Sequence, residues 1–185
     1  MGQIKQHPPV KAILGITYTH RFSLTPVFQE LEKIFSSIEI KSHVFDFTQF
    51  TKYYEPEMGT NLKKMFLVFA RLISAEELPD LKIKTNDLEH LFSEKTHRRA
   101  NLDPGYISDS KLVLATTKNY THRLYLLKGI FGDVHLAYHH NTFHAQPWTY
   151  PDYKQADIIE FFNQVRQRYL HQLGESYSSV PESLE

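Results

Sequence analysis

Four short segments in the second half of the chain, each of strand length, constrain the fold more than any other feature. Their ranges are 98–106, 111–117, 122–127 and 131–139. Asp103-Pro104-Gly105 and Gly129 are turn signals, and Lys118 to Thr121 is a plausible hairpin turn. Strands that follow one another through short turns pair antiparallel. The second half is therefore expected to form antiparallel strands.

The first half alternates strand and helix patterns. Lys11 to Thr19 is typical of a buried strand, and Phe22 to Ser36 has apolar residues at spacings of three and four, which predicts a helix. Ser23 or Thr25 can cap that helix. The remaining elements are strands at 38–47 and 65–73, a loop at 51–60, a helix that begins at the capping-box pattern of residues 74–77, and a last helix at 155–173.

Together these elements predict an α+β fold. The order strand, helix, strand, strand, helix, strand is the βαββαβ order of a ferredoxin-like core, here followed by extra C-terminal antiparallel strands and a terminal helix. A chain of 185 residues is long enough for one domain with a substantial core. We expect that domain at residues 11–173, after a flexible lead-in at 1–10 and before a polar tail at 174–185.

Composition excludes several classes of protein. The formal net charge is zero, which argues against a general nucleic-acid-binding protein. The absence of cysteine removes disulfides, zinc–thiolate sites and a cysteine nucleophile, and is compatible with the cytoplasm. No apolar run approaches the roughly 20 residues of a membrane helix, so we expect no membrane partner. The chain also lacks the GxxxxGK[ST], GxGxxG, HExxH and GxSxG patterns.

Polar residues repeat at structural spacings in two segments. Because side chains alternate along a strand, Arg99, Asn101 and Asp103 are predicted to share one face. Lys82, Asn86 and Glu89 are spaced i, i+4 and i+7 and form one stripe on a helix. Each set is either a solvated surface or one wall of a polar pocket, and the spacing alone favours solvated surface.

Two further groups lie near the predicted turns. Lys118, His122 and Arg123 could bind a phosphate or carboxylate, although His122 is equally compatible with a buried, hydrogen-bonded position. Asp133 and His135 share strand parity with His139 and could ligate a divalent metal. Eleven histidines make chance clustering common, so we assign no metal ligands.

Six blocks of sequence, in order, carry a family resemblance. They are Tyr54–Gly59, Lys84–Asn86 with Glu89, Asn101–Tyr106, Leu114–Lys118, His122–Leu126 and Trp148–Tyr153. The set resembles the signature of a bacterial family, domain of unknown function 4416, over about residues 11–153. The resemblance implies no established activity. Some members are labelled GTP-binding protein, but this chain has no phosphate loop. The family pattern has Glu where this chain has Asp133, and it does not include His135.

Three functions follow as hypotheses, and the sequence defines no reaction. The first is a pocket for an anionic small molecule such as a nucleotide or phosphorylated metabolite. Its binding residues would be Lys82, Asn86, Arg99, Asn101, Lys118, Arg123 and Asp133. If chemistry follows, His122 would carry the proton, with Asp103 or Glu89 as acid, base or magnesium ligand.

The second hypothesis is a non-catalytic module that binds protein or RNA through exposed aromatic residues such as Tyr106 and Tyr125, which could stack on bases. The neutral net charge makes nucleic acid the weaker partner. The third hypothesis is a structural role in which the charged stripes are only solvated surface. The pocket hypothesis requires the separate polar blocks to converge in three dimensions.

Overall fold

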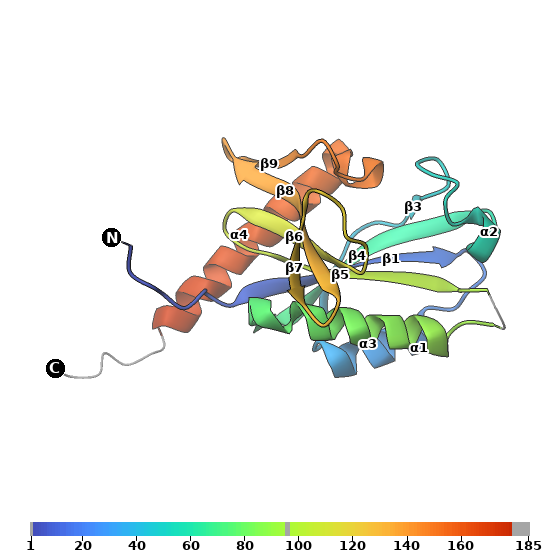
Figure 1. Ribbon diagram of the computed structural model, residues 1–185, viewed down its shortest axis with the longest axis horizontal. Helices are drawn as coiled ribbons and strands as arrows, with labels where there is room; N and C mark the ends of the chain where they lie inside the picture. The colour runs from blue at the N-terminus through green and yellow to red at the C-terminus, as the bar shows by residue number, and fades with distance from the viewer. Residues whose placement is uncertain (1, 95–96, 179–185) are drawn as a thin grey trace.

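The computed structural model describes residues 2–94 and 97–178 (Figure 1). Within them the chain forms a mixed α/β fold with one nine-stranded antiparallel sheet. The strands are β1 (Val10–Thr19), β2 (Ile38–Lys41), β3 (Phe45–Asp46), β4 (Leu62–Ile73), β5 (Ala100–Ile107), β6 (Lys111–Thr116), β7 (Arg123–Leu127), β8 (Ile130–His139) and β9 (Thr142–Ala145). The helices are α1 (Thr25–Ile34), α2 (Glu55–Met58), α3 (Leu78–Leu91) and α4 (Ala156–Ser178), with 3-10 turns η1 (Ala75–Glu77) and η2 (Pro151–Lys154).

The strands follow the order β2-β4-β1-β5-β6-β8-β7, with β3 paired to β4 and β9 paired to β8. Strand β1 is central, and Gly15 lies opposite Phe66 of β4 and Asp103 of β5. Helices α1 and α3 lie together on one side of the sheet, and α4 crosses the other side (Figure 1). The strand order thus brings β5 and β6 beneath α3, where polar side chains of all three elements can meet.

Alternation along β1 supplies two apolar cores, one on each face of the sheet. Leu14 and Ile16 pack in the cluster that contains Leu31 of α1 and Leu81 of α3. Ile13 packs on the opposite face with Phe162 of α4. Because both faces are covered, β1 is buried along almost its whole length, which matches the apolar run that predicted a buried strand.

Several expected boundaries in the first half of the chain are wrong. The residue that precedes α1 is Leu24, whose side chain makes no cap, so neither Ser23 nor Thr25 caps this helix. The expected strand at 38–47 is divided into β2 and β3, because Ser42 turns inward and its Oγ accepts a hydrogen bond from the backbone N–H of Phe66. The expected loop at 51–60 contains the short helix α2. The capping box at Ser74 is confirmed.

The second half departs from the prediction in its turns. Asp103-Pro104-Gly105 does not turn; it continues β5, because Leu14 and its neighbours pair with this segment along most of β1. A Cβ atom at Gly105 would overlap the carbonyl oxygen of Val113, so this glycine permits close approach of β6. Residues 118–121 do not form a hairpin turn either, since β8 lies between β6 and β7 and pairs with both. Strand β9 was not expected.

The C-terminal helix also exceeds its expected length. Its predicted end was Leu173, but α4 continues to Ser178, and the rest of the expected polar tail, 179–185, lies outside the described residues. None of the helices in the described ranges has the length and apolar character needed to span a bilayer.

Candidate functional site

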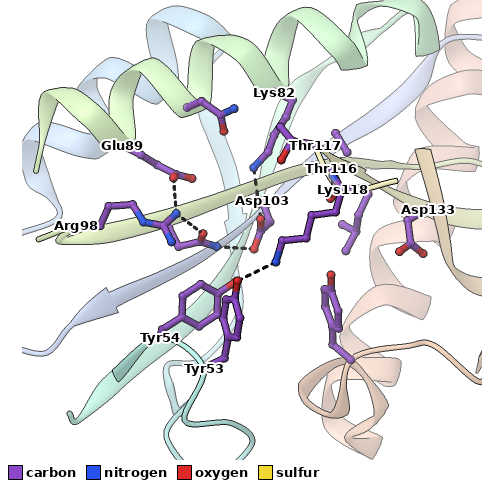
Figure 2. Close-up of a pocket in the computed structure, with 15 residues that line it drawn as sticks. Tyr53, Tyr54, Lys82, Glu89, Arg98, Asp103, Thr116, Thr117, Lys118 and Asp133 are labelled. Carbon is purple, nitrogen blue, oxygen red and sulfur yellow. Dashed lines mark hydrogen bonds and ion pairs between the residues drawn. The ribbon is translucent and has the colours of Figure 1, made fainter. Parts of the chain in front are cut away.

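A polar cavity of about 170 Å³ opens where α3, β5, β6 and the segment before α2 meet (Figure 2). Helix α3 contributes Lys82, Asn86 and Glu89, and β5 contributes Asn101 and Asp103. The remaining lining residues are Tyr53, Tyr54, Arg98, Leu114, Ala115, Thr116, Thr117, Lys118, Asp133 and Tyr150. Residues that are as much as 97 positions apart in the chain therefore share one cavity.

Lys82, Asn101 and Asp103 form the floor of the cavity. The Nζ of Lys82 donates to the backbone oxygen of Leu102 at 2.9 Å and lies 3.5 Å from Oδ1 of Asp103. The Nδ2 of Asn101 donates to the other carboxylate oxygen of Asp103 at 2.6 Å. Alternation in β5 explains why Asn101 and Asp103 point the same way. Asp103 is the most accessible of the three, and its carboxylate faces the open space (Figure 2).

Arg98 is neutralised on one side of the cavity by two carboxylates. Its guanidinium forms a bidentate pair with Glu57, through Nε at 2.6 Å and Nη2 at 2.7 Å, and Nη1 donates to Glu89 at 2.7 Å. Glu89 also accepts the backbone N–H of Leu102 at 2.7 Å. Burial raises the pKa of Glu89 above its ordinary value despite these partners. The contacts of Glu89 therefore join the end of α3 to β5. The two carboxylates leave little free positive charge on Arg98.

Lys118 differs from the other two cations of the cavity. Its side chain extends across the opening, and its Nζ donates to the hydroxyl of Tyr53 at 3.0 Å (Figure 2). The same Nζ lies 4.6 Å from the centre of the Tyr53 ring. Among residues 2–94 and 97–174, no carboxylate lies within ion-pair distance of Lys118. Its charge is therefore available to an incoming anion.

Asp133 forms the wall of the cavity nearest β7. Its Oδ2 accepts from the Nε of Arg123 at 3.0 Å and lies 3.3 Å from Nε2 of His122, while its Oδ1 lies 3.3 Å from Nδ1 of His135. Burial alone would raise the pKa of Asp133, but the hydrogen bonds from His135 and Arg123 outweigh burial, and the pKa lies below its ordinary value. Its negative charge is thus met by groups behind the cavity wall.

His135 links that wall to the segment before η2. The backbone N–H of Tyr150 donates to Nε2 of His135 at 3.0 Å, so the proton of the neutral ring is on Nδ1 and is directed at Asp133. Both ring nitrogens of His135 are therefore engaged in hydrogen bonds, which leaves neither of them free for a metal ion. Arg123 donates through Nη2 to the hydroxyl oxygen of Tyr150 at 3.1 Å, which leaves the Tyr150 proton available to a ligand.

The buried His135 makes stability depend on pH. Burial lowers the pKa of His135 below its ordinary value of 6.5. Below pH 6.5 the unfolded chain therefore takes up a proton that the folded state resists, and the free energy of unfolding falls as pH falls through the folded pKa. Denaturant unfolding between about pH 5 and pH 8 measures this slope. We expect a shallower slope in His135→Gln; an equal slope in both proteins would contradict the assignment.

Seven of the ten residues proposed from the sequence line this cavity, namely Lys82, Asn86, Glu89, Asn101, Asp103, Lys118 and Asp133. Arg123 and His122 lie behind Asp133, and the His122 ring stacks on Trp148 with centroids 4.8 Å apart. Arg99 does not enter the cavity; it pairs with Glu94 and lines a neighbouring hollow. The alternation that grouped Arg99 with Asn101 fails because β5 begins only at Ala100.

The sequence prediction missed the polar and aromatic lining residues that lie in loops or at the end of β6. They are Tyr53, Tyr54, Arg98, Thr116, Thr117 and Tyr150. The blocks that carried the family resemblance, Tyr54–Gly59, Leu114–Lys118 and Trp148–Tyr153, contain four of them and were the available signal. Burial, and then the charge of Asp103, raises the pKa of the Tyr54 phenol, so this hydroxyl keeps its proton inside the cavity.

Comparison with known proteins gives a family but no relative of known activity. No curated protein matches the chain, and no solved structure matches it. The family model described as a domain of unknown function, DUF4416, matches residues 8–169, which include every residue that lines the cavity. The chain belongs to the DUF4416 family.

Proposed function

We propose that the cavity binds a small metabolite that carries a phosphate or carboxylate group. The observation that supports this most directly is Lys118, whose ammonium extends across the cavity opening and contacts a phenol where the other cations contact carboxylates. Lys82 pairs with Asp103, and Arg98 pairs with Glu57 and Glu89. Among the described residues that line the cavity, Lys118 is therefore the cation without a carboxylate partner.

Hydroxyl groups near Lys118 suit the same anion. Thr116 and Thr117 line the cavity immediately before Lys118, at the end of β6. Tyr53 and Tyr150 each receive a hydrogen bond from a cation on their hydroxyl oxygen, so each has its own proton free to donate. A phosphate or carboxylate placed here would take the place of the Tyr53 phenol as acceptor of the Lys118 hydrogen bond. The new hydrogen bond would join two charged groups and would therefore be stronger.

Asp103 favours a hydrogen-bond donor on the ligand. Its partly exposed carboxylate faces the open space, and Asn86 also lines the cavity. We therefore propose a ligand that carries an acidic group together with a hydroxyl or amino group. The cavity is smaller than the ~300–1,000 Å³ of sites for drug-sized ligands, which favours a compact metabolite over a nucleotide.

Magnesium has little support as part of this site. Asp103 and Glu89 bond to Lys82 and Arg98 respectively, and Asp133 is occupied by Arg123 and two histidines. In the described residues, the group of three ligand atoms within 4.8 Å of one another lies elsewhere, on the β8–β9 hairpin. The proposal therefore assigns the cavity no metal ion and leaves His122 as a residue that positions Asp133.

The alternative of a protein- or RNA-binding module has one supporting feature. Tyr125 of β7 is 61% exposed and is followed by exposed Leu126 and Leu127 on an edge strand. Its expected companion Tyr106 is half-buried and packs against the core. The two aromatic residues therefore do not form one stacking platform, and the small-molecule proposal has the better support.

We also propose that the first half of the fold is a ferredoxin-like core. The strand order β2-β4-β1-β5, with every neighbouring pair antiparallel, supports this proposal. The contact between α1 and α3 on one face supports it too. In this arrangement β6, β8, β7 and β9 extend the sheet beyond β5, and the cavity lies where the core meets this extension.

Thermal shift tests the ligand proposal directly. We expect inorganic phosphate, phosphorylated sugars or small hydroxy acids to raise the Tm of the wild-type protein, since binding to the folded state stabilises it. In Lys118→Ala the loss of a charge-assisted hydrogen bond should weaken binding by about 1.5–3 kcal/mol, roughly 10- to 150-fold.

Lys128→Ala is the matched control, because Lys128 is exposed and pairs with Asp80 away from the cavity. It should keep the full shift. At about millimolar concentration even a weak ligand stabilises the folded state, by RT ln(1 + [L]/Kd). The absence of a Tm shift with every compound at that concentration would therefore contradict the proposal. An unchanged affinity in Lys118→Ala would contradict it as well.

A further inference from the structure

The β8–β9 hairpin carries a cluster of three histidine side chains, outside the cavity. His139, His140 and His144 each place a potential ligand atom within 4.8 Å of the other two. His139 and His140 are exposed and His144 is half-buried, so a solvated ion has access. The rings of His139 and His144 stack with centroids 3.7 Å apart.

The backbone explains why the three rings gather. Strands β8 and β9 pair Tyr138 with Phe143 and His139 with Thr142, so the two-residue turn is His140-Asn141. Both turn residues have positive φ, 48° and 65°, which is the conformation of a tight type I′ hairpin. His139 and His144 then lie on the same face as diagonal neighbours, and His140 projects from the turn beside them.

The hairpin is also well supported by the rest of the fold. The Oδ1 of Asn163 in α4 accepts the backbone N–H of Phe143 at 3.0 Å, and its Nδ2 donates to Thr142 at 2.9 Å. The buried Phe143 ring packs edge-on against Tyr138. The histidines therefore project from a rigid support, which reduces the entropy lost when they bind a common ion.

The spacing of the nitrogen atoms fits metal coordination. The Nδ1 atoms of His139 and His140 are 3.0 Å apart. Two imidazole nitrogens bound at ~2.0–2.1 Å to one tetrahedral zinc are separated by about 3.3 Å. The separation of these two nitrogen atoms is thus close to the value that a shared metal ion requires.

We propose that His139, His140 and His144 bind one late first-row divalent transition-metal ion, Zn²⁺ or Cu²⁺, through three imidazole nitrogens. Imidazole suits these metals, whereas Mg²⁺ and Ca²⁺ prefer oxygen ligands. Three protein ligands leave a fourth position for water or an external donor.

Calorimetric titration of the untagged protein with ZnCl₂ or CuCl₂ tests the proposal. We expect one ion per chain for at least one of the two metals, and no binding of MgCl₂. Loss of an outer-shell partner alone weakens metal binding by about 10- to 100-fold, so removal of a ligand in His139→Ala or His144→Ala should cost at least tenfold.

His90→Ala is the matched control, since His90 is exposed on α3 and lies outside the cluster. It should bind metal like the wild type. Because the ligands are on the surface, the Tm of each metal-free variant should stay close to that of the wild type. Absence of 1:1 binding for both metals, or equal affinity in the His139→Ala/His144→Ala double variant, overturns the proposal. Binding that His90→Ala reduces to the same extent overturns it too.

Discussion

Asp152→Ala is expected to lower the free energy of unfolding by about 3–5 kcal/mol. Lys64 of β4 and Asp152 of η2 form an ion pair with an Nζ–Oδ2 distance of 2.6 Å, and their side chains are 3% and 2% exposed. The Nζ of Lys64 is otherwise surrounded by aromatic rings, including Tyr153 at 4.8 Å. Without the carboxylate, the ammonium is left in the core with no counter-ion. Urea or guanidinium unfolding measures the loss.

An exposed ion pair of similar geometry provides the control. Asp80 and Lys128 are 2.7 Å apart, and both side chains are 53% exposed. Asp80→Ala should cost at most about 1 kcal/mol, because solvent screens surface pairs. Lys64→Met combined with Asp152→Ala should recover most of the loss, since neither charge then remains buried. Equal losses for Asp152→Ala and Asp80→Ala would show that burial of this pair does not matter.

Gly105→Ala is expected to destabilise the fold by about 3 kcal/mol, at the upper end of the cost of overpacking a core. The added methyl group would overlap the carbonyl oxygen of Val113 and come within 2.8 Å of the Leu114 side chain. The first of these is backbone in the adjacent strand, so β5 and β6 would have to separate. That separation would also disturb the cavity, because Asp103 and Thr116 line it from these two strands.

Gly174→Ala is expected to have the opposite effect on stability, although the substitution is the same. Gly174 lies in α4, and among the side chains that the structure describes and the backbone of other elements, no atom lies within 4 Å of the position its Cβ would occupy. Alanine has the higher helix propensity, so stability should rise by up to about 1 kcal/mol. Thermal or denaturant unfolding of the two variants compares the effects. A Gly105→Ala protein as stable as the wild type would mean that β6 can move away from β5 at little cost.

Much of the fold could be predicted from periodicity. The apolar run at Lys11 to Thr19 predicted β1. The spacing of apolar residues predicted α1, α3 and α4, and most of the expected helix ends lie within a few residues of the observed ones. The turn signal at Asp103-Pro104-Gly105 failed because local turn preference is weaker than pairing with the central strand. The position of β8 between β6 and β7 depends on pairing between strands that do not follow one another in the sequence, and no local pattern predicts such pairing.

The site was predictable where regular structure positions it. Spacing on α3 grouped Lys82 with Glu89, and alternation on β5 grouped Asn101 with Asp103. Arg98 was missed in favour of its neighbour Arg99, since parity has no meaning before the strand begins. Tyrosines from loops were missed as well, because a loop has no period from which the direction of a side chain can be derived.

The contact between the first strand and the last helix has a consequence for synthesis of the protein. Lys11 is fully buried, and its ammonium contacts Glu39 and, near the end of α4, Gln172. The hydroxyl of Tyr169 likewise donates to the backbone oxygen of Pro9 at 2.9 Å. Ribosomes synthesise the chain from its N-terminus, so one face of β1 stays uncovered until α4 has been made. The layer between this face of β1 and α4 therefore cannot form before α4 has left the ribosome.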